Sequence, residues 1–107
     1  MQIDTSFAAL ADPTRLGIVT RLAQTSEVDA TELARPFAIS QPAVSRHIKV
    51  LEDAGWVTRR SVGNRRPIRL NPEMIEQIHV WTGRLRATLA ANYARLDALL
   101  EEEDSPK

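Results

Sequence analysis

ISQPAVSRHIKVLEDAG, residues 39–55, has the pattern of one amphipathic helix with a defined start and end. Ser40 can accept a hydrogen bond from a free N–H of the first turn, and Pro42 falls in that turn, where a missing N–H costs little. Gly55 can adopt the left-handed conformation in which many helices end. Three apolar residues follow at i, i+4 and i+7 and form one stripe: Val44, Ile48 and Leu51.

The face opposite this stripe is short-chained, polar and basic. It offers hydrogen-bonding groups for base edges and charge for phosphates. An ordinary solvated helix face has the same composition, so the neighbouring sequence has to separate the two interpretations. At about 100° per residue, this face carries Pro42, Ser45, Arg46 and Lys49.

A second, shorter helix is predicted just upstream, over residues 30–35. Asp29 can cap it, and Glu32 three residues on completes a capping-box arrangement. Pro36 disfavours helical geometry at the residue before it, so this helix is expected to end early or to finish in a looser turn. Residues 37–39 are a connection short enough for a helix-turn-helix.

Two short strands are predicted downstream, over residues 57–60 and 67–70. Gly63 and Asn64 supply the turn chemistry between them. Pro67 cannot donate to a strand ladder, so its strand is expected to be an edge strand at that point. A helix, a turn, a helix and a basic hairpin follow one another in the order of a winged helix.

The charge distribution supports a surface that faces nucleic acid. The whole chain is neutral, with 14 basic and 14 acidic residues. Residues 35–69 nevertheless hold eight basic and two acidic residues, a net charge of +6, while residues 1–34 and 70–107 each carry a net charge of −3. A basic centre between acidic flanks is the electrostatic footprint of a DNA-binding face.

Several motifs resemble those of one bacterial family. The residues 40–51 and 54–57 look like the signature of the ArsR/SmtB family of winged-helix repressors, and residues 10–16 resemble its second-helix motif. The wing and residues 70–73 fit as well, so that the resemblance covers about residues 6–100. It implies a mainly α fold with a small β-hairpin wing and a long C-terminal dimerisation helix.

The resemblance also indicates which residues meet DNA, because family positions matching Gln41, Ser45 and Arg46 contact it. Glutamine suits adenine, and arginine suits guanine or a phosphate. His47 flanks the apolar stripe, so it either touches a phosphate or caps the core from one side. The candidate DNA contacts are Ser40, Gln41, Pro42, Ser45, Arg46, His47, Lys49, Arg59, Arg60, Asn64, Arg65 and Arg66.

The five candidates in the wing lie in a segment without acidic residues, which extends from residue 54 to residue 72. Local ion pairing is therefore not expected there, and a merely solvated charged hairpin is the less favoured interpretation. We expect the wing to contact phosphates, with one arginine in the minor groove as a further option.

The N-terminal part predicts two helices. The first is expected over residues 6–11, and the second begins with Asp12 as cap and Pro13 in the first turn. Residues 25–29 are expected to form a polar loop. The expected core residues of this part and of the following helix are Leu16, Ile18, Val19, Leu22, Ala23, Leu33 and Phe37.

The last helix is predicted from Asn71, which caps it, to about Glu102. A heptad seam runs along it: Ile75, Ile78, Thr82, Leu85, Leu89, Asn92, Leu96 and Leu99. Packing on its own domain can explain the first half, but the helix is too long for one small core to cover. In the resembling family, this helix and the first helix form the homodimer interface. The candidate interface residues are Phe7, Leu10, Ile78, Trp81, Leu85, Leu89, Tyr93 and Leu96.

Catalysis and cofactor binding are not indicated. The chain has two histidines and no cysteine, so it has no disulfides, no thiolate chemistry and little from which to build an active site. The cysteine metal site of many relatives is absent. Glu76 and His79 could supply two ligands across a dimer, but His79 as a partly buried packing residue is the favoured interpretation.

We therefore predict a cytoplasmic, homodimeric transcriptional repressor that binds an inverted-repeat operator, with no membrane span, metal or cofactor and with an unknown effector. Two alternatives stay open: a protein-interaction module with a winged-helix fold, and a metal-responsive repressor that uses His79. The expected single domain comprises N-terminal helices (6–29), a helix-turn-helix (30–55), the wing (56–71), the dimerisation helix (72–102) and a frayed tail (103–107).

Overall fold

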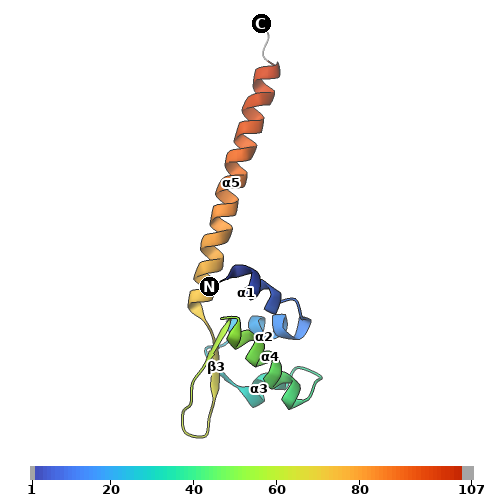
Figure 1. The fold of residues 1–107 in the computed structure, drawn as a ribbon, viewed down its shortest axis with the longest axis vertical. Coiled ribbons are helices and arrows are strands. Elements are labelled where there is room, and N and C mark those ends of the chain that lie inside the picture. Colours follow the sequence, from blue (N-terminus) through green and yellow to red (C-terminus); the bar gives the residue numbers. More distant parts are fainter. Residues whose placement is uncertain (1, 105–107) are drawn as a thin grey trace. The chain divides into compact units, whose positions relative to one another are not determined.

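The computed structural model describes the backbone of residues 2–104 and the side chains of residues 2–102. Its contacts form two compact units, one ending at Met74 and one beginning at Ile75. The predicted fold class is confirmed, since the chain is mainly helical with a small antiparallel sheet and a long C-terminal helix (Figure 1). The elements are α1 (Ile3–Ala9), α2 (Pro13–Ala23), β1 (Val28–Asp29), α3 (Ala30–Ala34), α4 (Gln41–Asp53), β2 (Val57–Arg59), β3 (Pro67–Leu70) and α5 (Pro72–Asp104).

Helix α4 begins and ends where its sequence predicts. The Ser40 hydroxyl accepts a hydrogen bond from the Ala43 N–H at 3.3 Å and caps the first turn. Gly55 follows the helix with a φ of 87°, the left-handed conformation that suits glycine. The predicted stripe is buried and anchors the helix in the core: Val44, Ile48 and Leu51.

Helix α2 confirms the predicted cap but not the whole predicted face. The Asp12 Oδ1 atom accepts from the backbone N–H groups of Thr14 at 2.8 Å and Arg15 at 3.1 Å. Leu16 is 50% exposed and Ala23 is exposed, so their assignment to the core was wrong. The buried residues Ile18, Val19 and Leu22 define the inner face, and about 100° per residue turns Leu16 away from Ile18 by about 200°.

Helix α1 starts three residues earlier than predicted and ends two residues earlier. The Gln2 carbonyl accepts from the Ser6 N–H at 3.2 Å, which extends the helix toward the N-terminus. Asp12 precedes a proline and is extended, with φ −108° and ψ 131°, so the helix has to end before it. Ser6 consequently lies inside the helix and is buried.

The sheet has the strand order β1-β3-β2, and all its pairs are antiparallel. Residues 28 and 29 were predicted to be part of a loop but form strand β1, in which Val28 is buried and pairs with Ile68. Two residues are too few to show an alternating pattern in the sequence. Strand β3 is central, so the prediction of an edge at Pro67 was wrong. Pro67 is the first residue of β3, where a missing N–H is tolerated, and its carbonyl accepts from Arg60 at 3.2 Å.

Helix α3 ends at Ala34, before Pro36, as expected. Asp29 stands at its N-cap position, but its side chain accepts no hydrogen bond there, so the predicted capping box is not formed. Leu33 is fully buried and Phe37 is partly buried, in agreement with their predicted core positions.

A buried tryptophan ties the first helix to the start of the wing. The Trp56 side chain is 4% exposed, and its indole N–H donates to the Ser6 carbonyl at 2.7 Å. On the other side, the Trp56 carbonyl accepts from the Asn71 N–H at 2.8 Å, and the Asn71 amide donates to the Gly55 carbonyl at 2.9 Å. These contacts join the two ends of the hairpin directly after α4.

The last helix is confirmed at its predicted start. The Asn71 Oδ1 atom accepts from the Glu73 N–H at 3.2 Å, and α5 continues to Asp104, two residues beyond the expected end. The rest of the predicted tail, residues 105–107, lies outside the described residues. In the part of the chain that the structure describes, no helix combines the length and the apolar character needed to cross a membrane.

Candidate nucleic-acid interface

The outer face of α4 presents five of the predicted contact residues to solvent. Gln41 and Pro42 are exposed in its first turn, and Ser45, Arg46 and Lys49 are exposed along it. Because the opposite stripe is buried, this orientation follows from the packing of the helix rather than from its charges. Lys49 pairs with Asp53 of the same helix at 3.0 Å, whereas Arg46 forms no ion pair with any residue whose side chain is described.

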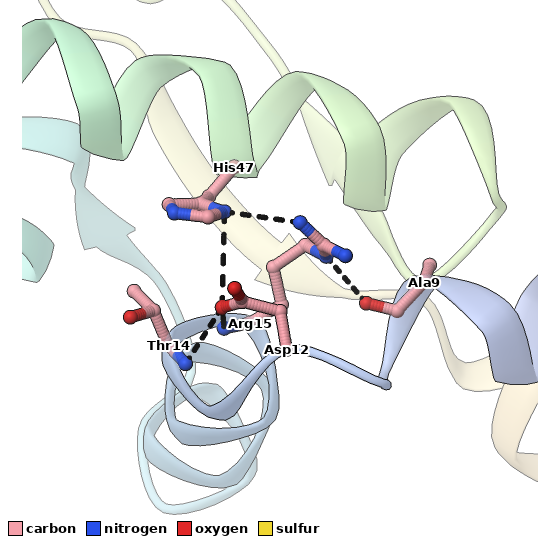
Figure 2. A network of polar contacts seen from close by, with 5 residues as sticks. All are labelled: Ala9, Asp12, Thr14, Arg15 and His47. Atoms are coloured by element: carbon pink, nitrogen blue, oxygen red, sulfur yellow. Dashed lines mark hydrogen bonds and ion pairs between the residues drawn. The ribbon is translucent and has the colours of Figure 1, made fainter.

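His47 does not share this outer orientation. Its ring points from α4 toward the start of α2, with Nδ1 3.2 Å from Arg15 Nη1 and 4.0 Å from Asp12 Oδ1 (Figure 2). The same Arg15 side chain donates through Nε to the Ala9 carbonyl. Of the two roles that the sequence left open, the structural one matches this geometry, because His47 connects α4 with the α1–α2 corner.

The charge of Asp12 is stabilised in this network. The backbone N–H of Arg15 contributes most to lowering the pKa of the Asp12 carboxyl, and the N–H of Thr14 and the positive charges of His47 and Arg15 lower it further, while partial desolvation opposes them. Since the folded pKa lies below the ordinary value of 3.8, the cap stabilises the fold above that pH. This contribution is lost as the pH falls through the lowered pKa of the folded protein.

Three of the four candidate wing arginines are paired, contrary to the expectation from their acid-free segment. Arg59 donates to both carboxylate oxygens of Glu52, at 3.1 and 3.3 Å. Arg60 donates to Glu27 at 2.9 Å. Arg65 Nε lies 3.8 Å from an Asp29 carboxylate oxygen.

These acids come from outside the hairpin, and this is why the local sequence did not reveal them. Strand β1 lies beside β3, so residues 27–29 reach the wing across the sheet although they are more than thirty positions away in the chain. Glu52 comes from the last turn of α4. At the tip, Asn64 and Arg66 are exposed, and Arg66 has no ion pair with a described side chain.

Helices α3 and α4 therefore form a helix-turn-helix with an exposed polar face, and strands β2 and β3 form a hairpin with basic side chains. The Helix-turn-helix domain model matches residues 10–60 of the chain. The HTH-type transcriptional regulator Rv2034 of Mycobacterium tuberculosis is 40% identical over 93 residues, which cover 87% of this chain and 86% of that protein. The arsenical resistance operon repressor of Staphylococcus xylosus is 37% identical over 78 residues, covering 73% and 74% of the two chains.

A solved structure agrees with these relatives. The crystal structure of an ArsR family transcriptional regulator superimposes with a TM-score of 0.73 at 31% identity and covers 82% of this chain and 90% of that one. The chain belongs to the ArsR family. It is therefore a helix-turn-helix transcriptional regulator with a winged-helix fold, as the motifs in its sequence predicted.

This ArsR-family chain has no cysteine, so a metal site built from cysteine thiolates cannot form in it. His79 is exposed on α5 in the single chain. Among the residues whose side chains are described, no group of three or more histidine, cysteine or acidic side chains is placed to hold a metal ion. Glu76 is exposed on the same helix.

The predicted dimer residues of α5 are largely open to solvent. Leu85, Leu89, Tyr93 and Leu96 are between 47% and 58% exposed. Nearer the start of the helix, Ile78 and Trp81 are partly buried. In the first unit, Phe7 is 37% exposed and Leu10 is partly buried.

Proposed function

We propose that this regulator is a homodimeric repressor that inserts α4 into the major groove of an inverted-repeat operator. The observation that carries the proposal is the division of α4 into a fully buried apolar stripe and an exposed face with Gln41, Ser45 and Arg46. Two such helices in a dimer, about 34 Å apart, would reach successive major grooves.

The wing would add contacts to the DNA backbone on each half-site. Phosphates attract arginine side chains without regard to sequence, so Arg59, Arg60, Arg65 and Arg66, together with Asn64, would add affinity rather than selectivity. Of the twelve candidate DNA contacts, His47 would act through the position of α4, since its ring faces α2 (Figure 2).

The dimer would form through α5. Its heptad seam repeats with the spacing of a coiled coil. The leucine side chains in this seam are each about half exposed in the single chain. A helix of 33 residues with such a face is typical of an interface between two copies.

Fluorescence anisotropy tests the DNA-binding proposal. The protein would be titrated against labelled DNA from upstream of its own gene and against a scrambled duplex, at one salt concentration near physiological ionic strength. Selective binding to the natural duplex is expected. Equal and weak binding to both duplexes would contradict an operator at that promoter. A second titration is made with added zinc, and release of the DNA by zinc would instead support the metal-responsive alternative with His79 and Glu76.

Arg46→Ala is expected to weaken operator binding by about 1–3 kcal/mol and to remove the preference at one base position, because a bidentate arginine contact reads guanine. The measurement is anisotropy with duplexes that vary one base pair at a time. Arg46→Lys is the matched control, since lysine keeps the charge but not the fork of donors. An equal loss for all sequences, with a smaller salt dependence, would instead make Arg46 a phosphate contact.

Glu27→Gln is expected to raise affinity for any duplex by about two- to fivefold, because an exposed ion pair is worth at most about 1 kcal/mol. In the free protein, Glu27 holds Arg60 at 2.9 Å and competes with a phosphate for it. Glu76→Gln removes one negative charge from α5 and serves as the control. Unchanged or lower affinity in Glu27→Gln would mean that Arg60 does not reach the DNA.

A further inference from the structure

A shallow pocket of about 460 Å³, wide open to solvent, lies in the first unit, outside the surfaces described so far. It is formed by one side of α2 and by the connection that leads from α3 to α4, and its walls include Leu16, Arg21, Gln24, Pro36 and Phe37. The volume falls within the range of about 300–1,000 Å³ that small-molecule sites occupy. Its size and its position next to the helix-turn-helix connection make it a candidate ligand site.

The walls of the pocket are mainly apolar and already in contact with one another. Leu16 is 50% exposed, so it presents its side chain to the pocket rather than to the core. The Phe37 ring lies so close to α2 that a Cβ atom on Gly17 would be 3.0 Å from Phe37 Cε1. The absence of a side chain at Gly17 thus lets the ring pack against the helix and form a preorganised apolar wall.

One cation in this apolar setting, Arg21, forms no ion pair with a described side chain. The Nε atom of Arg21 is buried and is the one buried side-chain nitrogen or oxygen, among the described side chains, that lacks a hydrogen bond. Arg21 also lines the pocket and is only partly buried, so an anion there would pair with its guanidinium, and such a charge-assisted pair is stronger at a partly buried side chain than in open solvent. A second polar group in the wall is the amide of Gln24.

We propose that this pocket binds a small organic carboxylate with a compact apolar body, such as a single aromatic ring. The carboxylate would pair with the Arg21 guanidinium, which presents donors in a fork suited to two oxygens. The apolar body would lie against Leu16 and Phe37. The charge of Arg21 selects an anion, and the apolar walls disfavour a highly hydrated one such as inorganic phosphate.

The position of the pocket links it to α4. Phe37 belongs to the connection between α3 and α4, so a ligand against its ring contacts the segment that leads directly into α4. An effect of the ligand on operator affinity would rest on the proposed function. Ligand binding itself is independent of that function, so binding is tested on the protein without DNA.

The experiment is a ¹H–¹⁵N NMR titration of the full chain with sodium benzoate, and with benzamide as the uncharged analogue of the same shape. Benzoate is expected to cause saturable shifts of the Gly17, Arg21 and Phe37 amide signals. Benzamide is expected to bind about tenfold more weakly or worse, because it cannot form the charge-assisted pair. No saturable shifts with benzoate, or equal binding of the two probes, would overturn the proposal.

Variants locate the site. Arg21→Met keeps a long apolar side chain and is expected to weaken benzoate binding by about tenfold or more, whereas Arg84→Met on α5 serves as the matched control and should leave it unchanged. If Arg21→Met does not fold, Leu16→Glu at the exposed rim tests the same point, since a second negative charge should repel benzoate. Wild-type affinity in the folded Arg21→Met or Leu16→Glu variant would overturn the assignment to this pocket.

Discussion

Leu89→Glu is expected to convert the regulator into a monomer and to lower its affinity for a complete operator by more than about a hundredfold, because two linked half-site contacts are replaced by one. Leu89 lies in the middle of the α5 seam and is 51% exposed in the single chain. In a dimer formed through this seam, its side chain would be buried against the partner helix. Two carboxylates there would have to lose their hydration without a counter-charge.

The test combines analytical ultracentrifugation with anisotropy on full-length and half-site duplexes. Binding to a half-site should change little, since α4 and the wing belong to the other compact unit. Ala94→Glu is the matched control, because position 94 lies on the side of the helix away from the seam in the heptad pattern. If the Leu89→Glu protein is still a dimer, the interface does not include Leu89. If it is a monomer with full operator affinity, DNA binding does not require dimerisation.

Trp56→Ala is expected to lower the free energy of unfolding by about 3–5 kcal/mol, the cost of removing a large buried aromatic side chain. The indole is 4% exposed, and its N–H donates to the Ser6 carbonyl at 2.7 Å. Removal leaves a cavity next to the end of α4 and an unsatisfied carbonyl in α1. For a chain of this size the loss is a large part of the total stability, about 5–15 kcal/mol.

Urea unfolding followed by circular dichroism, at one fixed protein concentration, measures this effect. Trp56→Phe should cost less, because most of the ring contacts are kept and mainly the hydrogen bond is lost. Val62→Ala in the wing is the control, since Val62 is 50% exposed and should change stability by no more than about 0.5 kcal/mol. A Trp56→Ala midpoint equal to that of the wild type would contradict the central position of this side chain.

The two effects concern different features of the regulator. Trp56 connects α1, the end of α4 and the first wing strand within one unit, whereas Leu89 lies on a helix of the other unit whose leucines are exposed. Replacing Trp56 weakens the unit that presents the DNA-binding face. Replacing Leu89 is expected to leave that face intact and to separate the two copies of the proposed dimer.

Local sequence was sufficient for the starts of α2, α4 and α5 and for the family. Ser40 and Gly55 delimit α4, Asp12 and Pro13 start α2, and Asn71 starts α5, because caps, prolines and left-handed glycines act within a few residues of the chain. The exposed face of α4 followed from the same information, since a buried stripe at helical spacing defines the opposite side.

Contacts between distant segments required the tertiary structure. The pairing of β1 with β3 made Pro67 part of a central strand and brought Glu27 and Asp29 to Arg60 and Arg65. Packing likewise turned His47 toward Asp12 and Arg15, and left Leu16 and Arg21 beside a pocket. Such contacts depend on strand register and helix packing, which join residues far apart in the chain and therefore leave no periodic trace in the local sequence.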